Sequence, residues 1–359
     1  MSLLRARQSE EITGPAPVAG ETVGCTQQEV AAGRRDCRAR IALLSNPNST
    51  QNMARLPEIR DYCASQPDIF HYEVDAAEET AEALRVIARV QPALLVINGG
   101  DGTVQAVLTE LHNGNAFGET PPPVAVLPSG KTNLIALDLG ADGGPIEMLK
   151  QLQAILVDGV EKHIVSRELI ALSHGDNDNK PVIGMFLGGA GLADIMLYCR
   201  HKIYPMGLPN GISHFLTAVA VVAQQLFGLK GKSLPPEPRP MRLDYDGKAP
   251  MDGRFAMLMV TTLEKLLLNQ DIDGKGRGGL KLVAIEHGRR RVLKALWASV
   301  TGALTKKKMD GVHVEETDRV EISGEASEVI LDGESFAARE GQSLLLKPAN
   351  PIRFVKLAA

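Results

Sequence analysis

One unit occurs twice in the sequence and constrains the fold more than any other feature. It consists of an apolar run, a glycine-containing loop and a helical segment, and it reads ALLVINGGDGTVQAVLTEL and then PVAVLPSGKTNLIALDL. An earlier apolar run, Ile41–Leu44, leads into a turn at Asn46. Strands that alternate with helices predict an α/β domain with a doubly wound parallel sheet. Such sheets bind ligands at the carboxyl ends of their strands, where the loops at Asn46, Gly99 and Pro128 are expected.

The rest of this first part fits the same architecture. A helix is expected around residues 53–66, followed by a short strand in FHYEV. In AEETAEALRVIARV, apolar residues recur at Ala81, Leu84, Ile87 and Ala88, which is the spacing of one buried helix face.

The pattern changes near residue 165. Short apolar runs such as SRELIALSH, MRLDYDG and QSLLLKPA then dominate, with turns between them. They predict an antiparallel β-sandwich with helical insertions at residues 212–229 and 292–304. We therefore expect a disordered tail over residues 1–37, an α/β domain over residues 38–165 and a β-sandwich domain over residues 166–359.

Composition and charge exclude several classes of protein. The net charge is −4, which argues against a nucleic-acid binder that depends on bulk positive charge. Four cysteines without a CxxC motif or metal-site spacing indicate a reduced, cytosolic protein. The first 37 residues lack the apolar region of a signal peptide. The longest apolar stretch, FLTAVAVVA, has nine residues, whereas a membrane-spanning helix needs about 20.

Charge is nevertheless distributed unevenly along the chain. No acidic residue occurs between Ile195 and Pro236, and residues 271–310 contain ten Lys or Arg against four Asp or Glu. Basic surface in the second half is compatible with contact to an anionic membrane. Basic residues that are simply exposed to solvent would explain the uneven charge distribution equally well.

The tripeptide Gly130-Lys131-Thr132 matches the last three residues of a P-loop, but the segment that contains it is not a P-loop. A P-loop needs another glycine five residues before this one, and that position is Ala125, inside an apolar run. The remaining loop is too short to wrap a triphosphate.

The stronger phosphate-binding candidate is the glycine loop, Gly99–Thr103, with the sequence GGDGT. Its glycines permit a positive φ and a close approach of a phosphate to the backbone. A helix is expected to start near Thr103, which could cap it or bind a phosphate oxygen, and its free N–H groups would point at the anion. Asp101 would repel a phosphate unless it binds a metal or accepts a proton. A tight turn with Asp101 as the helix cap is the structural alternative.

Four motifs follow one another along the chain: NPNS at Asn46–Ser49, GGDGT, PSGKTNLIA, and LDGES at Leu331–Ser335. Together they resemble the signature of the diacylglycerol kinase catalytic-domain family. That family includes bacterial lipid kinases, sphingosine and ceramide kinases and, more distantly, NAD kinases. The resemblance extends over residues 40–359.

The resemblance implies nucleotide binding by the residues that match these motifs, namely Asn46, Gly99, Gly100, Asp101, Gly102, Thr103, Gly130 and Asn133. Lys131 and Asp332 are two further candidates for contact with the nucleotide. Lys131 and Leu134 depart from the family, in which Thr or Ser and often Asp stand there. Sphingosine kinases are similar in lacking that Asp. Lys131 could contact phosphates through its charge, or it could be a solvent-exposed side chain at a loop tip.

The resemblance also implies phosphoryl transfer from ATP with Mg²⁺. Asp101 and Glu334 are both candidates for the catalytic base, because bacterial lipid kinases are interpreted with the Glu of Asp-Gly-Glu and sphingosine kinases with the Asp of the glycine loop. Asp332 could contact metal or nucleotide, although a plain Asp-Gly hairpin would explain LDGES. Asp194 resembles the residue that sphingosine kinases place against the lipid head group, or it caps the segment after Ala193.

A lipid acceptor requires access to a membrane. VLKALWASVTGALTKKK places large apolar residues on one helix face ahead of three lysines, which is typical of an interfacial helix; they are Leu293, Leu296, Trp297, Val300 and Leu304. A helix that covers the sandwich would have the same pattern. The acid-free segment 212–232 is a second candidate.

We therefore expect an ATP- and Mg²⁺-dependent lipid kinase that phosphorylates a hydroxyl of a diacylglycerol-like or sphingoid-like lipid. It would be cytoplasmic and peripherally associated with an anionic membrane. Residues 38–165 would bind nucleotide and residues 166–359 lipid, with the Asp-Gly-Glu loop and the C-terminus returning to the cleft between them. The alternatives are an NAD kinase-like small-molecule kinase and an inactive nucleotide or lipid sensor. A homodimer and a structural metal near Asp273 stay open, and no nucleic-acid partner is expected.

Overall fold

The computed structural model describes residues 41–174, 180–198, 238–246, 248–263, 279–300, 309–324, 328–338 and 342–357. All of them lie in one compact unit, Ala39–Ala359. Some features of the sequence analysis fall outside the described residues: the tail over residues 1–37, the segment 212–232, Asp273, and Leu304 with the three lysines that follow it. The predictions made for them stay predictions.

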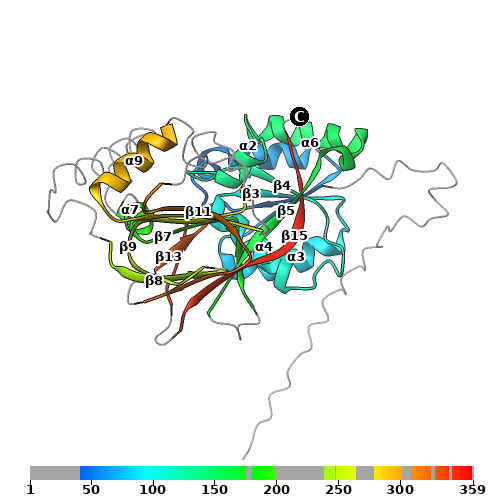
Figure 1. Cartoon of the computed structure of the whole chain (residues 1–359). Coiled ribbons are helices and arrows are strands. Elements are labelled where there is room, and N and C mark those ends of the chain that lie inside the picture. Colours follow the sequence, from blue (N-terminus) through cyan, green and yellow to red (C-terminus); the bar gives the residue numbers. More distant parts are fainter. Residues whose placement is uncertain are drawn as a thin grey trace, which may run out of the picture. The chain divides into compact units, whose positions relative to one another are not determined.

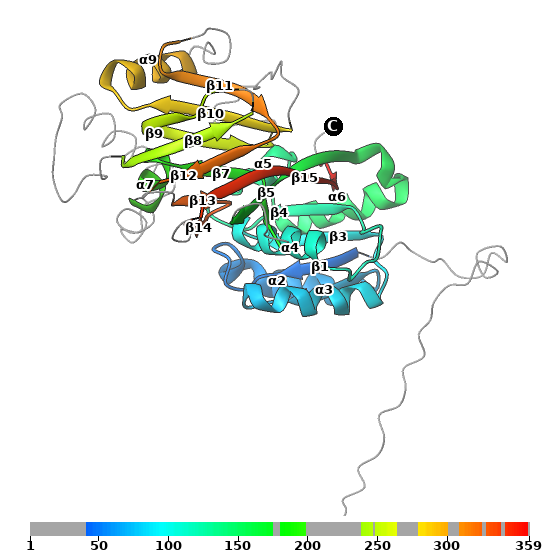
Figure 2. The same ribbon diagram turned by 60° about the horizontal axis from the view of Figure 1, so that its bottom comes forward.

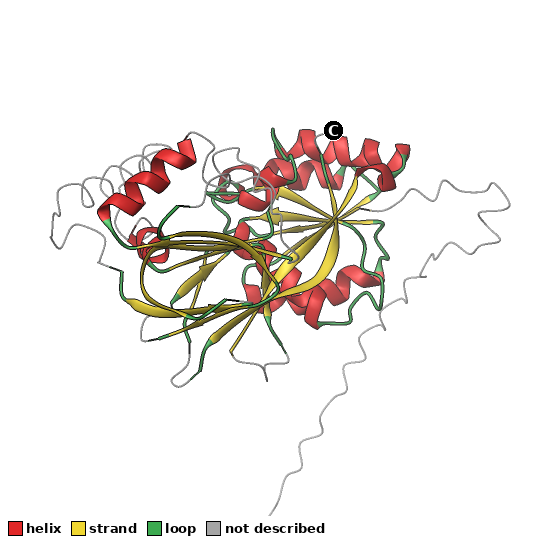
Figure 3. Ribbon diagram, viewed as in Figure 1, coloured by secondary structure: helices red, strands yellow, loops and turns green. Residues whose placement is uncertain are grey.

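A parallel sheet forms the first part of this unit. Its strands are β1 (Ile41–Ser45), β2 (Ile69–Glu73), β3 (Leu94–Gly99) and β4 (Val124–Pro128), in the spatial order β2-β1-β3-β4. Its helices are α2 (Asn52–Ala64), α3 (Thr80–Arg89), α4 (Asp101–Asn113), α5 (Leu134–Asp138) and α6 (Pro145–Asp158). Figures 1 and 3 show α2 and α6 on one face of the sheet and α3 and α4 on the other, so the predicted doubly wound architecture is confirmed.

Burial on both faces explains the composition of these strands. Every residue of β1 and β3 is buried, and a parallel strand covered by helices on both sides must be apolar nearly throughout. The helices are apolar on one side only. In α3, for example, Ala83, Leu84 and Ile87 are buried and Glu82 and Arg85 are exposed. Two short 3₁₀ helices, η1 (Ala77–Glu79) and η2 (Val160–His163), connect elements.

The second part consists mainly of antiparallel strands, as predicted. They are β5 (Ile164–His174), β6 (Val182–Gly184), β7 (Phe186–Gly189), β8 (Pro240–Tyr245), β9 (Met251–Thr261), β10 (Leu280–Glu286), β11 (Val312–Thr317), β12 (Val320–Ser323), β13 (Val329–Leu331), β14 (Glu334–Phe336) and β15 (Leu344–Val355). Two helices, α7 (Gly191–Tyr198) and α9 (Arg289–Val300), accompany them. Figure 2 shows these strands stacked beside the parallel sheet.

The long strand β9 joins two antiparallel layers. Its first residues pair with β8, whereas its later residues pair with β7 on one side and β10 on the other. Side chains from both layers, such as Leu243, Phe255 and Leu344, share one apolar core. This core supplies the buried area that stabilises the β part.

The C-terminal strand β15 connects the two parts. It pairs along nearly its whole length with β5 and reaches the parallel sheet where Phe354 pairs with Val124 of β4. Figure 1 shows it as the red strand beside β5 and β4. The C-terminal end of the described chain thus returns to the α/β part.

A polar stripe on α4 fixes the β part against the α/β part. Gln105, Thr109 and Asn113 are spaced by four residues and therefore lie on one helix face. Gln105 Nε2 donates to the Leu331 carbonyl at 2.7 Å, and Asn113 Nδ2 donates to the Pro181 carbonyl at 2.9 Å. Thr109 Oγ1 accepts from the Ile183 amide at 3.0 Å. These bonds orient β6 and β13 relative to the start of α4.

Several elements of the structure were not predicted from the sequence; α6 and β11 are two of them, and α7 is another. No helix was predicted at Pro145–Asp158, where α6 begins with a proline in its first turn, and no strand at Val312–Thr317, where β11 alternates apolar and polar residues. A proline at the first helical position and a period-two alternation are the signals that could have found them.

We predict that Gln105→Met lowers the free energy of unfolding by about 1–3 kcal/mol, because the buried Leu331 carbonyl loses its donor. The exposed Gln342 provides the control, and Gln342→Met is expected to change stability by less than about 0.5 kcal/mol. Urea denaturation of both variants measures the difference. Equal stability of the two variants would show that the polar stripe does not hold the two parts together.

Candidate functional site

The candidate site lies where the strand order of the parallel sheet reverses, between β1 and β3. The chain runs from β1 outward to β2 and then returns to the other side of β1, and ligands of such sheets bind at this point. Ser45, Asn98 and Leu127 are neighbours in the strand register, so the three loops that follow β1, β3 and β4 meet there. The predicted convergence of the loops at Asn46, Gly99 and Pro128 is confirmed.

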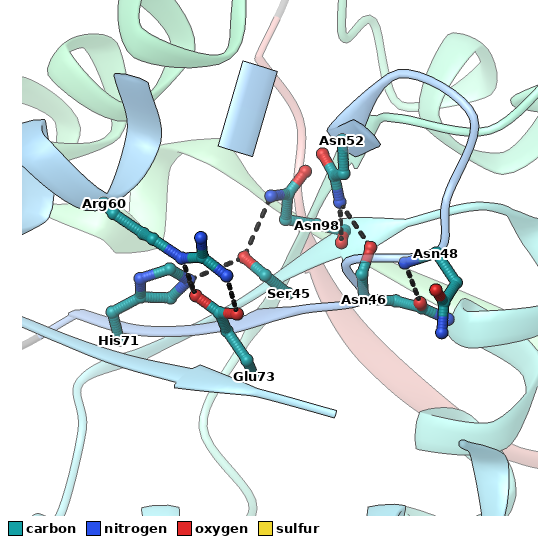
Figure 4. A network of polar contacts seen from close by, with 8 residues as sticks. All are labelled: Ser45, Asn46, Asn48, Asn52, Arg60, His71, Glu73 and Asn98. Atoms are coloured by element: carbon teal, nitrogen blue, oxygen red, sulfur yellow. Dashed lines mark hydrogen bonds and ion pairs between the residues drawn. The ribbon is translucent and has the colours of Figure 1, made fainter. Parts of the chain in front are cut away.

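A buried network of amide and hydroxyl side chains holds these strand ends together (Figure 4). Asn98 Nδ2 donates to Ser45 Oγ at 2.9 Å, and Asn98 Oδ1 accepts from the Ser129 hydroxyl. Asn52 Nδ2 donates to the carbonyls of Asn46 and Asn98, at 2.8 and 3.0 Å. Because buried polar groups are costly when unpaired, this network specifies one relative position for the three loops.

The network extends outward through His71. Its Nε2 lies 2.8 Å from Ser45 Oγ, and Glu73, on the same strand, is paired with Arg60. Figure 4 shows Arg60, His71 and Glu73 grouped beside Ser45. Burial lowers the pKa of His71, so the neutral ring is favoured near neutral pH.

The turn after β1 is tied to the glycine loop. Asn46 Nδ2 donates to Thr103 Oγ1 at 3.0 Å, and Ser49 Oγ accepts from the Gly100 amide at 3.2 Å. Asn46 Oδ1 also accepts from the Asn48 amide at 2.8 Å, which closes the turn itself. The first and second motifs of the sequence therefore form one structural unit.

The glycine loop differs in detail from its prediction. Helix α4 begins at Asp101 and not near Thr103, and Gly100 is its N-cap with φ −84° and ψ 177°. Neither Gly100 nor its neighbours Gly99 and Gly102 has a positive φ, so backbone conformation is not why glycine is needed. Close approach is the reason at Gly99, where a Cβ atom would lie 2.5 Å from the Cβ of Thr103.

The loop after β4 comes equally close to the glycine loop. A Cβ atom on Gly130 would lie 2.6 Å from the Cα of Gly100, so the two backbones touch directly. Asn133, with φ 56°, closes this second loop: its Oδ1 accepts from the Gly130 amide and its Nδ2 donates to the Gly130 carbonyl. Lys131, between them, is exposed. Ala125 is buried in β4, which excludes a P-loop, as predicted.

Asp101 points toward the start of α5. Burial raises the pKa of its carboxyl group, and hydrogen bonds from the backbone amides of Leu134, Ile135 and Asn133 oppose that shift. Its charge is therefore directed at the positive end of a helix. This arrangement explains how a carboxylate can stand in a loop suited to phosphates.

The LDGES motif forms a tight hairpin between β13 and β14. Asp332 and Gly333 are its two turn residues, with φ values of 46° and 94°, as a type I′ turn requires. The Asp332 carboxylate accepts from the backbone amides of Met185 and Phe186, at 2.8 and 2.9 Å. Burial, followed by the nearby charge of Asp101, raises the pKa of Asp332 to about 8.

This hairpin brings Glu334 to the start of α4. A Cβ atom on Gly102 would lie 3.0 Å from Glu334 Oε1, so the carboxylate faces the glycine loop across the space that a side chain would fill. Glu334 is exposed, whereas Asp332 is buried. Of the two acidic residues in the motif, Glu334 is thus the one accessible to a ligand.

Asp194 lies apart from this group, in the first turn of α7. Burial raises the pKa of its carboxyl group; Arg239 opposes the shift and Glu328 adds to it. The charged neighbours of Asp194 are thus residues of the β part. The assignment of Asp194 to the lipid head group stays a prediction.

No group of three or more His, Cys, Asp or Glu side chains in the described part of the chain is arranged to hold a metal ion. None of its helices combines the length and apolar character needed to cross a bilayer.

The model of the diacylglycerol kinase catalytic domain matches residues 40–163. The resemblance of the sequence motifs to this family is therefore confirmed, and the domain contains three of the four motifs. A comparison with curated proteins gave no match.

Solved structures resemble nearly the whole chain, including the strands that follow the diacylglycerol kinase catalytic domain. A protein of Bacillus anthracis str. Sterne, named as a putative diacylglycerol kinase, has 17% identity and a TM-score of 0.59, over 90% of this chain and 98% of its own. Another structure of that description, from the same organism, has 18% identity and a TM-score of 0.56, over 89% and 98%. At identities this low, the similarity shows a shared fold only.

Sequence reasoning missed residues that position the site of this kinase-family domain. Asn98, Ser129 and Asn52 form the buried network, and Gln105 anchors the hairpin. An amide at the end of the apolar run LLVIN was the available signal, because a buried polar residue needs a partner. The partner itself could not be inferred from the sequence.

We predict opposite effects of alanine at two glycines of the site. Gly130→Ala should destabilise the fold by about 2 kcal/mol or more, because the new methyl group meets the backbone of Gly100. Gly102→Ala should leave stability unchanged or raise it by up to about 1 kcal/mol, because only the end of the Glu334 side chain must move. Urea denaturation tests both. A fold that tolerates Gly130→Ala would contradict the direct backbone contact.

We predict that Asp332 makes the protein less stable as pH rises from about 4 to about 8. In this range the native state retains a proton that the unfolded state has lost, so the free energy of unfolding falls with pH. Asp332→Asn cannot titrate. The stability advantage of the natural protein over this variant should therefore shrink with rising pH, as measured by thermal unfolding. A constant difference would show that Asp332 is ionised throughout.

Proposed function

We propose that this protein is an ATP- and Mg²⁺-dependent lipid kinase that transfers the γ-phosphate to a hydroxyl of a diacylglycerol-like or sphingoid-like lipid. The observation that carries the proposal is the meeting of two glycine loops at the start of α4, opposite the exposed carboxylate of Glu334. The match of residues 40–163 to the diacylglycerol kinase catalytic domain supports it.

The two loops suit the phosphates of a nucleotide. The first amides of a helix favour an anion, and α4 begins at Asp101, directly after the backbone contact between Gly100 and Gly130. Lys131, exposed at the tip of the second loop, adds a cation. Asp101 is directed at α5, so its charge is partly offset by amides before any phosphate binds.

The residues present are compatible with ATP and Mg²⁺. Mg²⁺ is usually held by one or two carboxylates together with substrate phosphates, and it would neutralise charge on the phosphates when bound. Asp101 and Glu334 are the carboxylates on the glycine-loop side. Asp332 is less suited, because both of its oxygens already accept backbone hydrogen bonds.

We assign the base to Glu334 and a positioning role to Asp101. The lipid hydroxyl loses its proton to the Glu334 carboxylate, its oxygen forms a bond to the γ-phosphorus, and the bond to the β–γ bridging oxygen breaks to release ADP. Glu334 is exposed and faces the glycine loop, whereas Asp101 is engaged by backbone amides at the N-cap and in the first turn of α5.

The β part would bind the lipid, with Asp194 as a contact for its head group. Burial raises the pKa of the Asp194 carboxyl group, and a hydroxyl of the lipid could donate a hydrogen bond to it. The cytoplasmic, peripherally membrane-associated location and a homodimer stay predictions.

The test is incubation of the purified protein with γ-labelled ATP, Mg²⁺ and lipids in mixed micelles. Glu334→Gln should lower kcat by about 100-fold or more, because it removes a general base. Asp101→Asn should lower activity together with thermal stability, because it weakens the start of α5. Glu58→Gln, an exposed carboxylate on α2, is the matched control and should retain full activity.

The outcomes separate the candidate functions. Label in one lipid class that is lost in Glu334→Gln and retained in Glu58→Gln supports the assignment. Label on NAD in place of lipid would replace the proposal with the small-molecule kinase, and nucleotide binding without transfer would replace it with the sensor. Full activity of Glu334→Gln would overturn the choice of base.

A further inference from the structure

Helix α9 presents two chemically different sides. Val292, Ala295 and Ala298, spaced by three residues, pack toward the β part; Ala295 and Ala298 are buried, and Val292 contacts the main core. The helix lies against β10, as Figure 2 shows at the end of the antiparallel strands. This side of α9 thus packs against the β part through small apolar side chains.

Another side of α9 carries Arg290, Lys294 and Trp297. These residues are spaced by four and then three positions, so they share a helix face. All three are exposed, and 72% of the Trp297 surface is accessible. Sequence analysis left open whether this helix covers the sandwich or faces a membrane. In the structure one side of α9 covers the β part while Trp297 is directed to solvent.

The ion pairs in the described part of α9 involve a neighbouring arginine and not the cations of this face. Arg291 is held in ion pairs with Glu286 at 2.8 Å and Asp310 at 3.2 Å. Within the described residues, Arg290 and Lys294 have no such ion pair. The sequence contains no acidic residue between Glu286 and Asp310. The face is therefore positively charged around one large aromatic side chain.

We propose that the face formed by Arg290, Lys294 and Trp297 is the surface through which the protein contacts an anionic lipid bilayer. Basic side chains near an anionic surface add favourable Coulomb energy, and tryptophan prefers the boundary between head groups and acyl chains. The combination of basic side chains with an exposed indole on one helix is typical of helices that lie in the membrane interface, which favours a bilayer as the partner. This proposal rests on the proposed lipid kinase function, but membrane binding can be measured without any catalytic activity.

Trp297 makes the test direct, because it is the only tryptophan in the chain. The full-length protein is titrated, without ATP, with vesicles of phosphatidylcholine alone and of phosphatidylcholine mixed with phosphatidylglycerol. The indole emission should move to shorter wavelength and be quenched by brominated lipid only with the anionic vesicles. Cosedimentation in the same samples measures the bound fraction independently.

The variant Arg290→Glu with Lys294→Glu should lower vesicle binding by about tenfold or more. Arg89→Glu with Lys162→Glu, two exposed cations on α3 and η2, changes the net charge equally and is the control. It should bind vesicles nearly as the natural protein does. Trp297→Ala should weaken cosedimentation while leaving thermal stability unchanged.

Several results would overturn the proposal. Vesicle binding without any change in indole emission would place the contact elsewhere on the protein. Equal loss in both charge-reversal variants would reduce the effect to net charge. A concentration-dependent emission shift in the absence of lipid would identify the face as a contact between two copies. Failure to phosphorylate any lipid, with intact vesicle binding, would overturn the kinase proposal and leave this one standing.

Discussion

The contact between the backbones at Gly100 and Gly130 is the constraint on which the candidate site depends. A single Cβ atom would not fit between them, since it would lie 2.6 Å from the opposing Cα. The contact is possible because Asn98 and Ser129 bind each other behind it and because Asn133 closes the second loop. Together these interactions fix the start of α4 beside the second loop, and the start of a helix favours an anion.

The β part contributes to the same place through α4. Gln105 binds the hairpin at Leu331, and Asp332 fixes the turn by accepting two amides from the β6–β7 junction. The two carboxylates of the motif therefore have different roles. Asp332 is buried and positions the hairpin, whereas Glu334 is exposed and faces the glycine loop. This division explains why two carboxylates stand so close together in a short turn.

Much of this arrangement could be predicted from the sequence, because it depends on local pattern. Apolar runs that end in Asn46 or Gly99 predicted the strands and the edge at which their loops meet. The contacts that distinguish the roles of Asp101, Asp332 and Glu334 could not be predicted, because they join residues that are far apart in the sequence. Gln105 binds a carbonyl 226 positions later, and the sequence does not show that the amides of α5 engage Asp101. The importance of the glycines in the GGDGT loop was predicted correctly, but the reason was not. They are needed because neighbouring atoms approach the backbone closely, and not because the backbone adopts a positive φ.

A crystal structure with Mg²⁺ and a non-hydrolysable ATP analogue tests the central claim most directly. The account predicts that the phosphates lie against the first amides of α4, between the loops of Gly100 and Gly130, with the γ-phosphate on the side of Glu334. Phosphates bound at another edge of the sheet, or turned away from Glu334, would contradict it.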